Sequence, residues 1–401
     1  MPFMKIFGVA AEFNPFHNGH AALLEAARES GCSHCVAVMS GNFVQRCEPA
    51  VTDKRVRARA ALECGADLIL ELPVSRATAT AARFAQGAVY LMKACGCVDA
   101  IAFGSECGDA QKLRGAAQAV DSREIIIPLR KYLGEGMTFA KARQLAVGDV
   151  CGGDAARLIS TPNNILAVEY LRAAGELSWE VEAFTVKRFG AAHDSQKPDG
   201  KYAGASYLRT NINELEAYVP KQAAEIYNAA VKQGIYPHSK DKFEGMMLSY
   251  LRRLAPEQLA ALPELSEGIE GRLYRAIREG RSIPEIHAAL KTKRYTMSRV
   301  RRLVLCAFLG ITAADVLAPP PYLRVLGMNA RGRQILAKIR RNTALPLDTS
   351  LARLRSHSPA CARAALLEER ATDLYTAALP APFACGYEYT ASAVFVGYKD
   401  H

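Results

Sequence analysis

The sequence feature that most constrains the fold is an alternation of short apolar runs and helical stretches over the first hundred residues. Strand-like runs and helical stretches alternate in the order 6–10, 19–30, 36–39, 52–65, 68–72, 79–95 and 100–103. Strands that alternate with helices pair in parallel, because each helix carries the chain back across the sheet. The sequence therefore predicts an α/β fold with a doubly wound, mainly parallel, Rossmann-like sheet that binds its ligand at the carboxyl ends of the strands.

The pattern of apolar residues changes near residue 212. We predict a first domain at 1–212, which contains a mainly helical insertion near 111–148 and a further strand at 178–186. From 213 to 401 the apolar residues follow long helical periods, which predicts a mostly α-helical C-terminal half.

The excess of positive charge is confined to one segment of that C-terminal half. Residues 291–341 hold 12 of the 51 Lys and Arg residues but only one of the 40 acidic residues, Asp315, so the segment alone accounts for the net charge of +11. A charge run is usually a solvated helix face. With so few acids to pair with, however, this one favours a polyanion such as nucleic acid.

The sequence also indicates a reduced, cytoplasmic protein. No apolar run reaches the roughly 18 residues that a membrane span needs, and the N-terminus lacks the layout of a signal peptide. The eleven cysteines are scattered along the chain, which favours free thiols. Cys32 with Cys35, and Cys95 with Cys97, could supply a zinc site, but ordinary packing is the favoured interpretation. Nothing implies a stable protein partner.

The strongest local signal is AEFNPFHNGH at residues 11–20, where the first strand should meet the first helix. A loop that ends at a helix N-terminus directs free N–H groups and the positive end of the helix dipole at an anion. His17 and His20 can donate hydrogen bonds to phosphate oxygens, and Gly19 lets a nucleotide approach the backbone. We predict that both histidines are catalytic, because fixed donors stabilise the charge that spreads over the oxygens of a reacting phosphorus. The alternatives are a pair of metal ligands or two surface histidines.

Further segments, together with this motif, resemble one family. They are MSGNFVQR at 39–46, DLILELP at 67–73, FGSE at 103–106, PNNIL at 162–166, HD at 193–194, TKRYT at 292–296 and RVLG at 324–327. The N-terminal half resembles the HxGH nucleotidyltransferase superfamily. The whole chain is similar to the bacterial tRNA(Met) cytidine acetate ligases. The resemblance implies a nucleotidyltransferase domain at 1–212 and a basic, tRNA-binding region at 213–401.

The resemblance also implies a reaction in two steps. Acetate would attack the α-phosphorus of ATP to give acetyl-adenylate, and the N4 amine of the wobble cytidine of elongator tRNA(Met) would then take the acetyl group. The product would be N4-acetylcytidine. The residues by themselves indicate a phosphate site but nothing that identifies acetate. ATP chemistry makes Mg²⁺ an expected companion.

ATP contacts are predicted at the loop and at residues on neighbouring strands and turns. Gly104 could instead be a plain turn glycine, Asn163 and Asn164 could cap a helix, and Lys187 with Arg188 could be a solvated pair. Two departures from the family pattern are Tyr207, which replaces a small hydroxyl residue, and Cys47, which replaces a glycine. The predicted set is Ala10, Ala11, Glu12, Phe13, Asn14, Pro15, Phe16, His17, Asn18, Gly19, His20, Gly104, Asn163, Asn164, Lys187, Arg188, Ser206 and Arg209.

Two basic clusters are predicted to bind tRNA. The first, beside the nucleotide loop, includes Lys54 and Arg55, which could face ATP, RNA or solvent. In the second, cations surround Tyr295, whose ring could stack on an unpaired base; the alternative is a helix with a buried apolar face and its cations in water. This second cluster consists of Lys291, Lys293, Arg294, Tyr295, Arg299, Arg301 and Arg302.

Two other functions share parts of this pattern. An adenylyltransferase that makes a dinucleotide cofactor would use the same phosphate chemistry, but it would leave the basic C-terminal half unexplained. A non-catalytic RNA-binding protein would use the basic half and keep the nucleotide pocket as a structural or regulatory feature.

Overall fold

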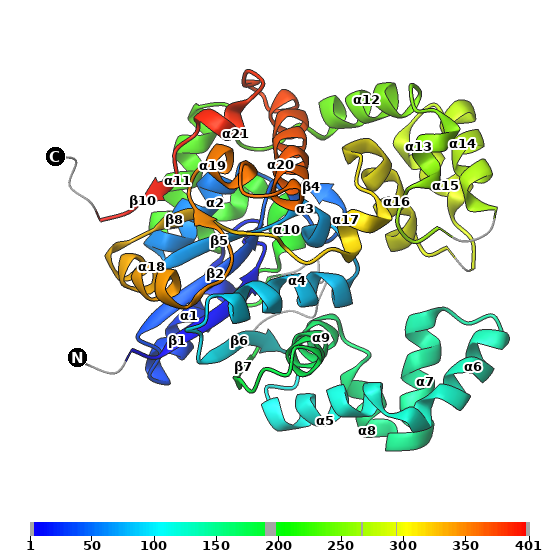
Figure 1. Ribbon diagram of the computed structural model, residues 1–401, viewed down its shortest axis with the longest axis horizontal. Helices are drawn as coiled ribbons and strands as arrows, with labels where there is room; N and C mark the ends of the chain where they lie inside the picture. Colours follow the sequence, from blue (N-terminus) through cyan, green and yellow to red (C-terminus); the bar gives the residue numbers. More distant parts are fainter. Residues whose placement is uncertain (1–3, 189–197, 266–267, 294, 398–401) are drawn as a thin grey trace.

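The computed structural model describes residues 4–188, 198–265, 268–293 and 295–397. Its central sheet has the order β10-β8-β5-β2-β1-β6-β7, and β9 pairs with β8 (Figure 1). All neighbours are parallel except β5 and β8, so the predicted doubly wound, mainly parallel sheet is confirmed. The strands are β1 (Ile6–Ala11), β2 (His34–Ser40), β5 (Leu68–Leu72), β6 (Ala100–Ser105), β7 (Glu182–Lys187), β8 (Leu323–Met328), β9 (Leu347–Asp348) and β10 (Val394–Phe395).

Alternating side chains of these strands build two apolar cores. In β2, Val36 and Val38 face one core, and Ala37 and Met39 face the other, because successive side chains of a strand point to opposite faces. The first core is covered by α4 (Ala81–Ala94), α9 (Pro162–Glu176) and α18 (Ala330–Asn342). The second is covered by α1 (Asn18–Glu29), α2 (Lys54–Glu63) and α11 (Lys221–Lys232). A sheet buried on both faces explains why its strands are almost continuously apolar.

The predicted strand at 178–186 begins too early. The chain leaves α9 through a turn in which Ser178 and Trp179 donate backbone hydrogen bonds to Gly175 and Ala174, and Ser178 has a φ of +48°. This turn belongs to the end of the helix, so β7 starts only at Glu182.

Around the predicted insertion near 111–148 the chain is helical from Ala110 to Leu158. This segment consists of α5 (Ala110–Asp121), the 3₁₀ turn η1 (Arg123–Ile125), α6 (Ile126–Gly134), α7 (Phe139–Cys151) and α8 (Gly153–Leu158). It leaves the sheet after β6 and returns through α9, so it lies beside the carboxyl end of β6.

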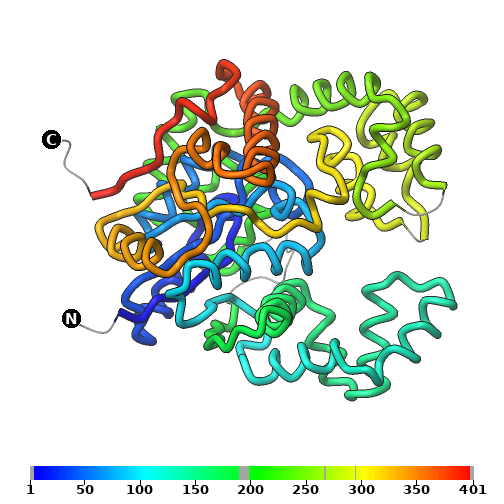
Figure 2. The backbone as a smooth tube through the Cα atoms, in the orientation of Figure 1, coloured from blue at the N-terminus to red at the C-terminus, as the bar shows by residue number. Residues whose placement is uncertain are grey.

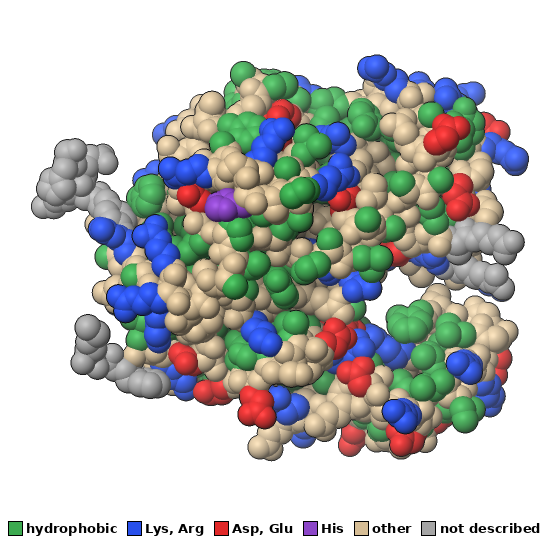
Figure 3. Space-filling model, in the orientation of Figure 1, with side chains coloured by type: hydrophobic (Ala, Val, Ile, Leu, Met, Phe, Trp, Pro, Cys, Tyr) green, Lys and Arg blue, Asp and Glu red, His purple; other side chains and the backbone are tan. Residues whose placement is uncertain are grey.

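The C-terminal half forms a separate helical subdomain and then returns to the sheet (Figure 2). The helical subdomain has its own apolar core, to which α3 (Val74–Ala77) and the hairpin β3 (Phe43–Val44) and β4 (Glu48–Pro49) also pack. In Figure 3 an open hollow separates the helical subdomain from the insertion. The helices of the helical subdomain are α12 (Lys240–Leu251), α13 (Pro256–Ala260), α14 (Ile269–Glu279), α15 (Ile283–Leu290), α16 (Met297–Leu309) and α17 (Ala313–Leu317).

The predicted division of the chain at residue 212 misses one feature: part of the C-terminal half returns to the sheet of the first domain. α10 (Ala205–Thr210) and η2 (Ile212–Ala217) lead into the mostly helical half, as expected, but β8 pairs with β5 and extends the nucleotide-binding sheet. A charged residue, Arg324, interrupts the apolar run of β8, and this hid the strand in the sequence. The chain ends with α19 (Leu351–Arg355), α20 (Pro359–Ala377), α21 (Tyr387–Thr390) and β10.

Candidate active site

A cavity of about 610 Å³ lies where the carboxyl ends of β1, β6 and β7 meet. Its volume is in the range of sites that bind small molecules and nucleotides. Fourteen of the eighteen residues predicted to bind ATP line it: Ala10, Ala11, Glu12, Phe13, Asn14, His17, Gly19, His20, Gly104, Asn163, Lys187, Arg188, Ser206 and Arg209. Pro15, Phe16, Asn18 and Asn164 are not among the lining residues.

The two histidines of the loop form a stacked pair, with ring centroids 3.8 Å apart. The backbone N–H of Gly19 donates to Nδ1 of His17 (3.1 Å), and the backbone N–H of His17 donates to Nδ1 of His20 (3.2 Å). An Nδ1 that accepts a hydrogen bond carries no proton, so the proton of each neutral ring is on Nε2. The first turn of α1 thus fixes the tautomer of both rings and leaves each with one N–H donor.

Both rings stay neutral because they are buried. Burial, together with the positive charges of Arg188 and Arg209, lowers the pKa of His17 to about 3. Burial and the neighbouring His17 ring lower the pKa of His20 well below its usual value. His17 is only 6% exposed and His20 is half-buried against it, so the pair does not lie free on the surface as that alternative had it. The pair can therefore donate hydrogen bonds to a substrate while both rings are uncharged.

The rest of the loop is held by contacts with residues on the side away from the cavity. Asn14 Oδ1 accepts a hydrogen bond from the N–H of Val51 (2.8 Å), and the N–H of Phe16 donates to the hydroxyl of Tyr227 (2.8 Å). The Phe16 ring is buried against Phe13, with centroids 5.1 Å apart. These contacts explain why Pro15 and Phe16 support the loop without lining the cavity.

Arg57 of α2 fastens the loop to the sheet, a role that the sequence did not reveal. Its side chain is fully buried and donates to the carbonyl oxygens of Glu12 (2.6 Å), Ser40 (3.2 Å), Thr52 (3.1 Å) and Gly41. One guanidinium therefore joins the ends of β1 and β2, so the backbone of the nucleotide loop cannot move independently of the sheet.

The opposite wall is built by the loop after β6 and the start of α9. The Glu106 carboxylate accepts hydrogen bonds from the backbone N–H groups of Asn163 (3.1 Å) and Asn164 (2.7 Å). Asn164 Oδ1 in turn accepts from the N–H groups of Glu106 (2.9 Å) and Cys107 (3.2 Å). The proposed capping of α9 by the two asparagine side chains is therefore wrong, because Glu106 binds the N–H groups there. Asn164 is buried and holds the loop that presents Gly104 to the cavity.

The cationic side of the cavity comes from Lys187, Arg188 and Arg209. Arg188 Nη1 donates to Asn163 Oδ1 (3.0 Å), and Arg209 donates to the carbonyl of Asn14 (3.0 Å) and to Ser206 Oγ (3.3 Å). The two guanidinium groups thus bridge separate segments of the wall. Since the hydroxyl of Tyr207 donates to Glu214 and Tyr207 is not among the lining residues, the departure at this position supplies no hydroxyl to the cavity.

The remaining lining is largely apolar. Phe84, Phe103, Leu166 and Tyr170 contribute to a surface against which a nucleotide base can pack. Phe84 and Tyr170 carry no signal in the sequence, because they look like ordinary core residues, and Phe103 and Leu166 stand out only as members of the family-like segments. Only the fold brings them to the same cavity as the histidines.

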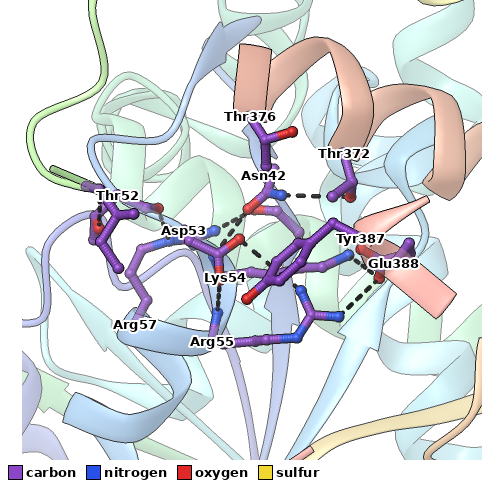
Figure 4. Close-up of polar contacts among 12 residues, drawn as sticks. Asn42, Thr52, Asp53, Lys54, Arg55, Arg57, Thr372, Thr376, Tyr387 and Glu388 are labelled. Carbon is purple, nitrogen blue, oxygen red and sulfur yellow. Dashed lines mark hydrogen bonds and ion pairs between the residues drawn. The ribbon is translucent and has the colours of Figure 1, made fainter. Parts of the chain in front are cut away.

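Lys54 and Arg55 do not face a bound RNA, so this part of the predicted tRNA surface is wrong. Lys54 is 0% exposed, and its Nζ lies 2.5 Å from Glu71 Oε1 and 2.7 Å from Glu388 Oε1 (Figure 4). The Arg55 guanidinium, also buried, lies over the ring of Tyr387, 4.8 Å from its centroid. Both cations are used to bind α21 to α2, through partners that are more than 330 residues away.

The second basic cluster divides into residues that are buried or paired within the protein and residues that are exposed. Tyr295 is 8% exposed, and the Arg299 guanidinium lies 4.1 Å from its ring centroid, so the predicted stacking on a base is wrong. Arg302 donates to both carboxylate oxygens of Glu264 (2.7 and 3.0 Å), and Arg299 donates to the Glu264 carbonyl. The apolar face of α16 is buried, as the alternative had it: Leu303, Val304 and Leu305.

Lys291, Lys293 and Arg301 form the exposed set. Arg294 lies outside the described residues. Arg324, from the same basic segment, is buried between Glu71 and Glu388. The charge excess is therefore only partly a surface feature.

Cysteines and acidic residues provide no metal centre in the part of the chain that the structure describes: no three His, Cys, Asp or Glu side chains are grouped to hold an ion. Burial raises the pKa of Cys35 well above its usual value and that of Cys97 to about 11, so these thiols stay protonated. In the same described residues, no helix is both long and apolar enough to cross a membrane.

The other departure from the family pattern, Cys47 in place of a glycine, keeps the backbone conformation that glycine favours. It has a φ of +60°, in the left-handed region where glycine is favoured. Its Sγ donates to the carbonyl of Thr78 (3.3 Å) and it packs against the core of the helical subdomain.

A doubly wound sheet with paired imidazole donors at the start of its first helix is the arrangement of a nucleotidyltransferase, and the family model described as HIGH Nucleotidyl Transferase matches residues 4–385. A tRNA(Met) cytidine acetate ligase from Thermoanaerobacter sp. (strain X514) is 38% identical over 388 residues, or 94% of this chain and 96% of that protein. One from Caldanaerobacter subterraneus subsp. tengcongensis is 40% identical over 364 residues, or 88% and 90%.

Solved structures agree. The crystal structure of apo TmcAL from Thermotoga maritima has a TM-score of 0.91 and 31% identity, and the alignment covers 98% of this chain and 99% of that one. The same protein bound with alpha-thio ATP has a TM-score of 0.89 and 30% identity, with equal coverage. The chain belongs to the tRNA(Met) cytidine acetate ligase family.

Proposed function

We propose that this protein uses ATP to activate acetate as acetyl-adenylate and transfers the acetyl group to N4 of the wobble cytidine of elongator tRNA(Met). The names of its relatives support the substrates. The observation that carries the chemistry is the stacked pair of His17 and His20, which presents two neutral N–H donors at the wall of a nucleotide-sized cavity.

In the first step, a carboxylate oxygen of acetate attacks the α-phosphorus of ATP. The bond between that oxygen and phosphorus forms, the bond from the α-phosphorus to the bridging oxygen breaks, and pyrophosphate leaves. The Nε2–H groups of His17 and His20 donate to the phosphate oxygens as charge spreads over them, and fixed donors do this without reorganising. Lys187, Arg188 and Arg209 offset the charge of the leaving pyrophosphate.

In the second step, the N4 amine attacks the acetyl carbon of the adenylate. The new C–N bond forms, the C–O bond to AMP breaks, AMP leaves with its phosphate, and N4 loses one proton to solvent. The product is N4-acetylcytidine. A cavity wall of apolar side chains suits this step because it excludes water, which would otherwise hydrolyse the adenylate.

Mg²⁺ is expected to accompany ATP. Glu12 is the one acidic side chain among the described residues that line the cavity. Mg²⁺ is commonly held by one or two carboxylates, water and substrate phosphates. Burial raises the pKa of Glu12, and its Oε1 already accepts the N–H of Gln45, so Oε2 is the oxygen that would hold an ion arriving with ATP, and such an ion would offset phosphate charge.

The predicted ATP-binding residues that line the cavity are proposed to contact ATP, and Asn164 is proposed to act by holding the loop around Gly104. For tRNA, we propose Lys291, Lys293 and Arg301 as phosphate contacts, because their side chains are exposed on the helical subdomain. The catalytic unit is proposed to comprise residues 1–212 together with the strands that return to the sheet.

The test is incubation of the purified protein with ATP, labelled acetate and total bacterial tRNA, followed by nucleoside analysis. Acetate-dependent exchange of labelled pyrophosphate into ATP, measured without tRNA, reports the first step. We expect both exchange and labelled N4-acetylcytidine. Exchange that requires a phosphorylated nucleoside in place of acetate would favour a dinucleotide-forming adenylyltransferase, and absence of any turnover would favour a non-catalytic RNA-binding protein.

A further inference from the structure

One residue of the helical subdomain reaches the active-site cavity. Of the described residues that line it, Ser298 is the one contributed by the chain beyond Arg209. Ser298 is exposed and lies in the first turn of α16, after the N-cap residue Thr296. The lining residues Gln45 and Arg46, in the turn of the β3–β4 hairpin, are half-buried. Ser298 therefore lies at an outer edge of the cavity, which is in contact with solvent.

The other side chains of α16 hold it within the helical subdomain. Arg299 and Arg302 both bind Glu264, and Val300 is fully buried in the core of the helical subdomain. Phe43 of the hairpin is buried in the same core. The hairpin is tied to the nucleotide loop as well, because the N–H of Gln45 donates to Glu12 Oε1 (2.8 Å). Both sides of the opening are therefore connected to the same helical core, and the hairpin side is also bonded to the nucleotide loop.

Exposed positive charges on α16 indicate which substrate enters the cavity between Ser298 and the hairpin turn. Ser298 and Arg301 are three residues apart and so lie on the same face of the helix, about 4.5 Å apart along its axis. Arg301 is exposed, while the two neighbouring arginines are engaged by Glu264. Lys291 and Lys293 are exposed just before the helix. Exposed cations on α16 and just before it are not needed by acetate, but they suit the phosphates that flank a base.

We propose that the acceptor base of the RNA reaches the adenylate past Ser298, between the first turn of α16 and the hairpin turn at Gln45 and Arg46, with a flanking phosphate on Arg301. The proposal rests on the proposed function and assigns the route by which its second substrate arrives. Because the anticodon base must be unstacked to enter a cavity, the route requires single-stranded RNA. A small side chain at position 298 leaves room for the ring.

The experiment compares Ser298→Trp and Ser298→Ala with the unmodified protein in two assays, pyrophosphate exchange without tRNA and acetyl transfer to tRNA. We expect Ser298→Trp to lower transfer at least 10-fold more than it lowers exchange, because the indole narrows the opening. Ser298→Ala should keep transfer within about threefold of the unmodified protein. The matched control is Ser249→Trp, which places the same ring on an exposed serine of α12 in the helical subdomain and should leave both activities unchanged.

Arg301→Gln tests the phosphate contact. It should raise the KM for tRNA several-fold and reduce the salt dependence of tRNA binding by about one phosphate contact. Arg331→Gln, an exposed arginine on α18, serves as its control and should change neither quantity.

Three results would overturn the route. Transfer by Ser298→Trp at the rate of the unmodified protein would place the base elsewhere. An equal loss of exchange and transfer would mean that the opening serves ATP, and an equal loss of transfer in Ser249→Trp would mean that the helical subdomain is disturbed as a whole. Absence of transfer in the unmodified protein would instead refute the proposed function, and the route with it.

Discussion

Replacement of His20 by alanine is the most direct test of the paired-imidazole site. The substitution removes the Nε2–H donor and also the Nδ1 acceptor of the His17 N–H. Loss of one fixed donor to a transition state costs about 2.7–4 kcal/mol, so pyrophosphate exchange should fall about 100- to 1,000-fold. Loss of the acceptor leaves an N–H at the start of α1 without its partner, which should lower the free energy of unfolding by about 1 kcal/mol.

A second variant separates these two effects. In His20→Asn, the side-chain oxygen can occupy the position of Nδ1 and accept from the His17 N–H, but nothing replaces the Nε2–H donor. We expect His20→Asn to recover most of the stability, measured by urea unfolding, while exchange at saturating ATP and acetate stays as low as in His20→Ala. Exchange by His20→Ala within about threefold of the unmodified protein would refute the role of this ring, as would recovery of exchange in His20→Asn.

Three further predictions follow from buried groups. Arg57→Lys keeps the charge but cannot reach four carbonyl groups, so it should lower kcat for exchange at least 10-fold and destabilise the fold; unchanged kcat would show that the loop does not depend on this clamp. Lys54→Met should lower the free energy of unfolding by about 3–5 kcal/mol, because it removes one of the two buried cations that Glu71 and Glu388 share and leaves them only Arg324 in common, and tRNA affinity should not change in filter binding. Since the pKa of His17 is about 3 in the folded protein, the unfolded chain binds the extra proton as the pH falls below about 6.5, so stability should be full above pH 6.5 and decrease towards pH 3; urea unfolding at pH 7.5 and pH 5 that gave equal stabilities would contradict this.

The parallel sheet and the nucleotide loop were predictable because their signals are local. The alternation of strand-like runs and helices defines the sheet, and the loop motif falls where its first strand ends. β8 was missed for the opposite reason. Its central Arg324 is compatible with a buried strand only because Glu71 and Glu388, distant in the sequence, neutralise it there.

The same distinction applies to the site. His17 and His20 carry an unusual spacing, so the sequence identifies them. Lys54 and Arg55 look like surface cations in the sequence. Their partners, the Glu388 carboxylate and the Tyr387 ring, are more than 330 residues away, so the nearby sequence gives no sign of their burial. Tyr295 was predicted to stack on a base because many cations surround it in the sequence. The sequence does not show that two of them, Arg299 and Arg302, pair with Glu264.

Neighbouring residues are enough to specify the phosphate-binding loop between a strand and a helix, because the backbone N–H groups and imidazole donors at that junction depend only on local sequence. The tertiary structure decided which groups are available at that site. It enclosed the two imidazoles so that they stay neutral, turned Lys54, Arg302 and Arg324 inward to carboxylates, and brought Ser298 of a distant helix to the cavity. Burial and pairing depend on contacts between residues far apart in the chain, and only the folded chain brings those residues together.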